Sequence, residues 1–242
     1  MATATPVTLA PLPPPPSGQC PQIRRPWRYL DATHKSVTGL LDSFNLVRTT
    51  TVTANATAKG RLGSDQEDLL RAALVFTSSG LDACCQQLVR EAAQDLIDRG
   101  GTAATQFRLY LDGELQGTKA PDGFLDAITA PDPRRQLIDR YVEAKTTASF
   151  QGSSDLQKRV RDLLGIPNQK LPKTRFMALD DFFTARNDIV HQLDYVDPAS
   201  TSVSRNRKSA TKVATECGQV LALIADLIHA TADLLRSKSA ST

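Results

Sequence analysis

The 242-residue sequence predicts an all-α fold, an up-and-down helical bundle with a helical insertion. Apolar residues recur at the three- and four-residue spacing of amphipathic helices over most of the chain, and runs of alternating β-branched residues are few. Hydrophobic residues make up 40% of the chain, which is enough to bury a core. The length is consistent with a single domain and a tail.

The tail is a proline-rich segment at residues 1–28. It carries eight of the 14 prolines of the chain, and proline has no backbone N–H to donate. We therefore expect a disordered or polyproline N-terminal tail. The folded part should begin near Trp27 to Asp31 and form one domain over residues 29–242.

The first two helices are predicted at about residues 31–54 and 64–99. Residues 64–67, "SDQE", match a capping box at the start of the second helix, and two glycines at 100–101 supply its stop. The apolar stripe of this helix has helical spacing. Its members are Leu70, Ala73, Leu74, Thr77, Leu81, Cys84, Leu88, Ala92 and Leu96.

An insertion at about residues 101–172 is also predicted to be helical. Asp132 followed by Pro133 is typical of a cap and a first helical residue, so a helix should run to about Ala148. Ser154 and Gln157, spaced as a capping box, indicate a short helix.

Two further helices, at about 174–195 and 206–236, complete the predicted bundle. The last helix should turn one apolar stripe inward. That stripe consists of Val213, Cys217, Val220, Leu221, Ile224, Leu227, Ile228 and Leu235.

The helix at 174–195 contains "ARNDIVHQ", in which Arg186 falls near the centre of an apolar face. Each helical residue advances by about 100°, which places one set of apolar side chains around this arginine. The set is Leu179, Phe182, Phe183, Ile189, Val190 and Leu193. His191 lies about 140° from Arg186 around the helix, so a site that uses both must draw on another helix or a second copy of the chain.

The motif "RNDIVH" resembles the R-x4-6-H motif of the HEPN superfamily (higher eukaryotes and prokaryotes nucleotide-binding). The resemblance covers the bundle from about Tyr29 to Leu235. It implies a helical homodimer and, as in many members, a metal-independent endoribonuclease of toxin–antitoxin or antiviral defence systems. An antitoxin or another regulatory protein is then a further candidate partner.

On this resemblance, the catalytic residues are Arg186, Asn187 and His191 and the substrate is RNA. Histidine suits the removal of the ribose 2′-OH proton because its ordinary pKa of about 6.5 lies near working pH. A guanidinium stabilises the charge that develops on the phosphate, and Asn187 lies one turn before His191. The structural alternative is that Arg186 extends to solvent or pairs with Asp180 or another acid. The functional alternative is a non-catalytic helical module that binds a nucleotide or a protein partner.

Four cations at the start of the last predicted helix are candidates for positioning RNA phosphates: Arg205, Arg207, Lys208 and Lys212. Cations are disfavoured at a helix N-terminus, and an anionic partner would relieve that mismatch. An ordinary solvated basic turn is the alternative.

The overall charge argues against the class of proteins that bind nucleic acid over a broad basic surface. Lys+Arg number 29 and Asp+Glu 26, but three of the arginines lie in residues 1–28, so the rest of the chain is formally neutral. The four cysteines lack C-x-x-C spacing, which indicates buried thiols, and we expect a cytoplasmic protein without a membrane span.

No metal or other cofactor is expected. Asp226, His229 and Asp233 share one helix face, but a polar stripe opposite Ile224 and Ile228 accounts for them. The sequence contains no phosphate-binding glycine loop, no dinucleotide fingerprint and no zinc-protease or serine-hydrolase motif. It therefore offers no competing catalytic set.

Overall fold

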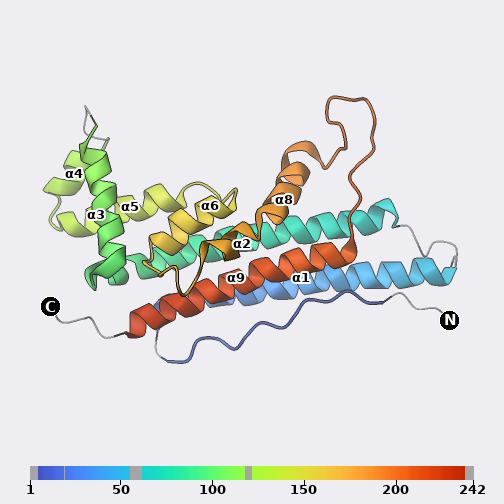
Figure 1. The fold of residues 1–242 in the computed structure, drawn as a ribbon, viewed down its shortest axis with the longest axis horizontal. Helices are drawn as coiled ribbons and strands as arrows, with labels where there is room; N and C mark the ends of the chain where they lie inside the picture. Colours follow the sequence, from blue (N-terminus) through green and yellow to red (C-terminus); the bar gives the residue numbers. More distant parts are fainter. Residues whose placement is uncertain (1–4, 19, 55–61, 118–121, 238–242) are drawn as a thin grey trace. The chain divides into compact units, whose positions relative to one another are not determined.

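The computed structural model describes residues 5–18, 20–54, 62–117 and 122–237. Its elements are α1 (Pro21–Ala54), α2 (Ser64–Asp98), α3 (Gly101–Leu115), α4 (Phe124–Thr129), α5 (Pro133–Thr146), α6 (Ser153–Leu156), the π-helical stretch η2 (Gln157–Asp162), α7 (Lys173–Met177), α8 (Asp180–Gln192) and α9 (Ala210–Arg236), shown in Figure 1. Within the described ranges, the only β-pairing is one isolated bridge between Tyr195 and Arg205. The predicted all-α helical bundle is confirmed.

The chain divides into two compact units. The first unit comprises Met1–Pro14, Arg28–Leu81 and Ala178–Ala225, and the second comprises Pro15–Trp27, Asp82–Met177 and Asp226–Thr242. The second unit takes parts of α1, α2 and α9 as well as the predicted insertion, and the single domain over 29–242 stays a prediction.

The N-terminal segment departs from the prediction. Helix α1 begins at Pro21, inside the predicted disordered tail, since proline at the first helical position loses no backbone hydrogen bond and has a suitable φ. Earlier in the chain, Val7 N–H donates to Asn45 Oδ1 (2.9 Å) and Asn45 Nδ2 donates to the Val7 carbonyl (2.8 Å). The tail boundary at residue 28 is therefore wrong, and Val7 is tied to α1.

The sequence predicted a capping box at the start of α2 and a glycine stop at its end. The predicted capping box at 64–67 is not formed, because Glu67 contacts Arg71 (3.4 Å). Gln66 Oε1 instead accepts from the Gly63 N–H (3.2 Å). The chain leaves α2 through glycines at 100 and 101 with φ of 87° and 67°, as predicted. Every member of the predicted α2 stripe is buried.

Of the two helix caps predicted in the second unit, one is formed and one is not. Asp132 accepts from Arg135 N–H (3.1 Å) ahead of Pro133, which confirms the predicted start of α5. The box predicted at 154–157 is wrong, because Asp155 accepts the Gln151 N–H (3.1 Å) and α6 begins at Ser153 without a side-chain cap.

Two predicted helices are shorter than expected. The predicted helix at 174–195 is broken after Met177, and α8 begins at Asp180. The last helix begins at Ala210 instead of 206, since Asn206 N–H donates to the Asp194 carbonyl (2.8 Å) and holds this stretch against the end of α8. The basic residues Arg205, Arg207 and Lys208 consequently lie in a loop.

The predicted inward stripe of α9 is buried throughout, and all four cysteines are buried thiols that form no disulfide, as predicted. In the described part of the chain, α9 alone has the length and composition to cross a membrane, and 61% of its most apolar window is buried. A buried core helix meets the same criteria.

Candidate functional site

Arg186 lies half-buried on α8 in the first unit and is held by neutral groups. Its Nε donates to Ser78 Oγ of α2 (3.1 Å), and its Nη1 donates to Asn187 Oδ1 (2.9 Å). Among the described residues no carboxylate forms an ion pair with Arg186, so the pairing with Asp180 considered above is not formed. Its positive charge is oriented without being neutralised.

Arg71 on α2 is a buried arginine whose charge, unlike that of Arg186, is paired with carboxylates. Its side chain is 5% exposed and contacts Asp194 (2.8 Å), Asp68 (3.0 Å) and Glu67 (3.4 Å). Burial alone lowers the pKa of Arg71, but hydrogen bonds and charges from Asp194 and Asp68 outweigh burial and raise the pKa above its ordinary value. Arg71, whose role is structural, is therefore surrounded by acids, whereas Arg186 is not.

The apolar face around Arg186 is buried on the N-terminal side of the arginine and exposed on the C-terminal side. Leu179, Phe182 and Phe183 precede Arg186 and are buried, whereas Val190 and Leu193 follow it and are 44% and 63% exposed. The second half of the face thus places uncovered apolar surface beside the arginine.

His191 is exposed in the last turn of α8. The chain reverses directly after it, because Leu193 and Asp194 both adopt left-handed backbone angles, with φ of 51° and 63°. Their N–H groups donate to the carbonyls of Ile189 (3.1 Å) and Asp188 (2.9 Å). In the described part of the chain, no hydrogen bond joins His191 to Arg186, in line with their angular separation on one helix.

Asp194 anchors this reversal and was missed by sequence reasoning. Its side chain is fully buried and accepts from Arg71 Nε (2.8 Å), Lys208 Nζ (2.9 Å) and Asn206 Nδ2 (3.3 Å). The available signal was Arg71 itself, a charged residue directly beside Leu70 of the α2 apolar stripe. Lys208 is consequently an internal partner of Asp194 in this structure.

The other loop cations border a cavity of about 510 Å³ at the start of α2. Arg205 is bound by both carboxylate oxygens of Asp68 (2.8 and 3.1 Å). Burial acts to raise the pKa of Asp68, but Arg205 and Arg71 outweigh it and keep the pKa below its ordinary value. Arg207 is exposed on the cavity wall and pairs with no carboxylate among the described residues.

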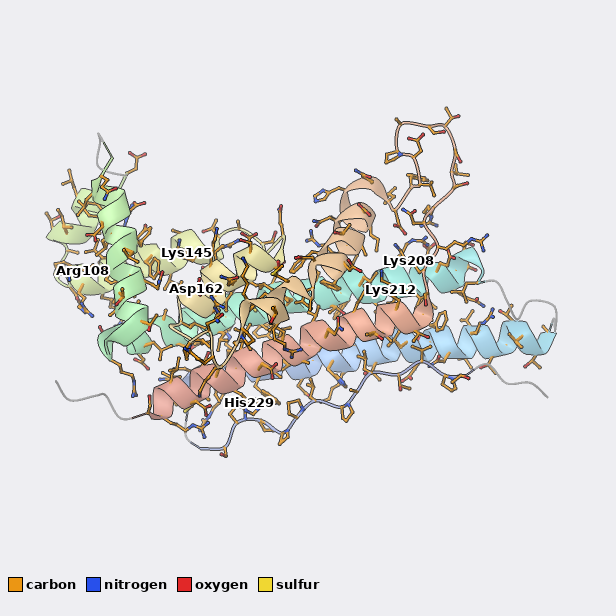
Figure 2. The ribbon with its side chains drawn as sticks, in the orientation of Figure 1. Arg108, Lys145, Asp162, Lys208, Lys212 and His229 are labelled. Atoms are coloured by element: carbon orange, nitrogen blue, oxygen red, sulfur yellow. The ribbon has the colours of Figure 1, made fainter. Side chains whose placement is uncertain are left out.

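Lys212 lies in the first turn of α9, close to Lys208 (Figure 2). Its Nζ lies 3.4 Å from Asp181 Oδ2 and 3.5 Å from Glu216 Oε1. Of the four predicted phosphate-binding cations, Arg205, Lys208 and Lys212 therefore already face acids within the chain. A phosphate would have to compete with those acids for them.

The described residues contain no group of three or more His, Cys, Asp or Glu side chains arranged to hold a metal. Asp226 instead pairs with Arg175 and Asp233 with Lys170, both at 2.6 Å. The His229 ring lies edge-on to Trp27 with their centroids 5.7 Å apart. These contacts accord with the predicted polar stripe.

Comparison of the chain with protein-family models, curated proteins and solved structures gave no match. The resemblance of "RNDIVH" to the HEPN motif therefore rests on the sequence and supports a proposal only.

Proposed function

We propose that the chain is a metal-independent endoribonuclease of the toxin or antiphage-defence type, with Arg186, Asn187 and His191 as its catalytic residues. The observation that carries the proposal is the setting of Arg186, which Ser78 Oγ and Asn187 Oδ1 orient and no described carboxylate neutralises. A guanidinium kept in that state is suited to a phosphate group that gains negative charge.

His191 supplies the second part of the proposal. It is exposed and therefore accessible to a ribose hydroxyl, and an imidazole can accept that proton near neutral pH. Because the two side chains diverge on one helix, we propose that a second copy completes the site. Two α8 helices packed about a two-fold axis would bring both arginines and both histidines into one cleft.

The proposed dimer gives the first prediction. The exposed Val190 and Leu193 would be buried between the copies, so Val190→Asp should dissociate the dimer by placing a charge in an apolar contact. Light scattering at micromolar concentration should give twice the 26.3 kDa chain mass for the wild type and a single chain mass for the variant.

Leu46→Asp is the matched control, because Leu46 on α1 is 69% exposed and lies outside the proposed contact. It should remain dimeric. A wild-type mass close to that of one chain would contradict the dimer.

The second prediction concerns the chemistry. Attack by the 2′-OH should leave 2′,3′-cyclic phosphate and 5′-hydroxyl ends, and cleavage of total RNA should continue in EDTA because His191 and Arg186 are proposed to replace a metal. DNA should remain intact because it lacks the attacking hydroxyl.

The measurement is end-group analysis of RNA after incubation with and without EDTA. Cleavage that occurs only with a divalent metal would rule out this mechanism. If no RNA is cut, the alternative of a non-catalytic module that binds a nucleotide or a protein partner becomes the better reading.

A further inference from the structure

The proline-rich segment before α1 contains a stretch, residues 9–14, that the fold holds in place. It belongs to the first unit and forms no helix or strand. Asn45 of α1 exchanges hydrogen bonds of 2.9 and 2.8 Å with the Val7 backbone. His34 Nε2, also of α1, lies 2.9 Å from the Ala10 carbonyl oxygen. The stretch is therefore tethered along α1 (Figure 1).

Burial along this stretch repeats every three residues. Leu9 and Leu12 are half-buried, whereas residues 10–11 and 13–14 are exposed. A polyproline II helix has three residues per turn, and proline favours it because the ring fixes φ at about −65°. The pattern therefore indicates a polyproline II helix with three edges. The edge of Leu9 and Leu12 is covered by the fold, and the other two edges face solvent.

The two uncovered edges carry a pattern that polyproline-binding domains recognise. Such domains hold PxxP sequences in grooves lined by aromatic side chains, and residues 11–14, PLPP, have that form. A groove contacts two edges of a three-edged helix and leaves the third edge outside. In this chain the third edge is the one that the fold already covers, so a groove can reach the other two without displacing the stretch.

The charge of the segment narrows the class of partner. Residues 1–23 carry no charged side chain, so the phosphates of RNA, of DNA or of a membrane surface find no cation in it. Proline rings packed against aromatic rings are the contact that this segment offers. The segment therefore favours a protein groove over an anionic partner.

We propose that residues 10–14 dock into the aromatic-lined groove of a partner protein's polyproline-binding domain, of the WW type. Two X-Pro pairs, at residues 10–11 and 13–14, occupy its pockets. Since Asn45 and His34 already order the segment, the complex forms with a smaller loss of conformational entropy than a free peptide requires. The proposal is independent of the ribonuclease activity proposed above.

The test is NMR titration of the full chain into isotope-labelled WW domains, chosen from a panel because they bind the free peptide of residues 5–17. We expect the full chain to shift the resonances of the groove aromatic residues and to bind at least about threefold more tightly than the peptide. Affinity should change less than about twofold between about 0.05 and 0.5 M salt, because the segment is uncharged.

Pro11→Ala and Pro14→Ala should each weaken binding at least about tenfold, because each removes a ring from a groove pocket. Pro15→Ala is the matched control. Pro15 is exposed but follows Leu12 by three residues, so it lies on the edge that the groove leaves outside, and its replacement should change affinity less than about twofold. All three prolines are exposed, so thermal unfolding should be unchanged.

A second pair of variants tests the tether. Asn45→Ala removes both hydrogen bonds to Val7 and should lower the affinity of the full chain to about that of the peptide. Ser43→Ala, at an exposed site on the same helix, should bind as the wild type does.

The proposal would be overturned if no domain of the panel bound the free peptide. It would equally be overturned if the peptide bound and the full chain did not, because α1 would then block the segment. Equal weakening by Pro15→Ala and Pro11→Ala would overturn the assigned edges and with them the proposal. Loss of binding at high salt would overturn it in favour of charged groups elsewhere on the chain.

Discussion

Replacing Asp194 by alanine should destabilise the protein by about 3–5 kcal/mol, the usual cost of removing one partner from a buried ion pair. Asp194 is fully buried between Arg71 and Lys208, whose side chains are 5% and 11% exposed. Its removal leaves Lys208 without its acceptor. Alanine also tolerates the left-handed backbone at φ 63° less well than aspartate does.

Urea unfolding followed by circular dichroism measures this effect. Asp194→Asn retains the backbone tolerance and isolates the charge, and it should still cost more than about 1 kcal/mol. Asp197→Ala, an exposed site in the same loop, is the control and should change stability by less than about 1 kcal/mol. If Asp194→Ala also changed the free energy of unfolding by less than about 1 kcal/mol, the buried network would not be what holds the loop.

His191→Ala and Arg186→Ala should each reduce RNA cleavage by at least about 100-fold, if the proposed function holds. The first variant removes the proposed base and the second removes the charge that stabilises the phosphate. The two losses should not add, because both groups act on one transition state. Arg186→Lys should not restore activity, since an ammonium lacks the planar fork of donors.

His34→Ala and Arg175→Ala are the matched controls. His34 hydrogen-bonds the Ala10 carbonyl near the N-terminus, and Arg175 pairs with Asp226 on the second unit. Both should cleave RNA at the wild-type rate, measured from initial rates on one labelled RNA at matched thermal stability. Unchanged cleavage by His191→Ala would remove that residue from the mechanism.

The sequence by itself determined the helical architecture and which faces of its long helices are buried. The stripe from Leu70 to Leu96 and the stripe from Val213 to Leu235 are buried as their spacing predicted. These features depend on residues within one or two helical turns, so periodicity is sufficient to find them. The Asp132 cap of α5 is local in the same way.

Only the tertiary structure decided which charges are neutralised. Arg71 meets Asp194 across 123 residues, and Arg205 meets Asp68 across 137, so no spacing rule links either pair. The Asp194 contacts lie at the end of α8 and before the start of α9. Sequence patterns placed the start of α9 at about residue 206, four residues too early. Likewise, the tertiary structure brings Ser78 to Arg186 and Asp194 to Arg71. Glu67 and Asp68, by contrast, reach Arg71 from the same helix at i,i+4 and i,i+3 spacing. Ion pairing depends on which distant side chains reach each other, and that is set by how the helices pack.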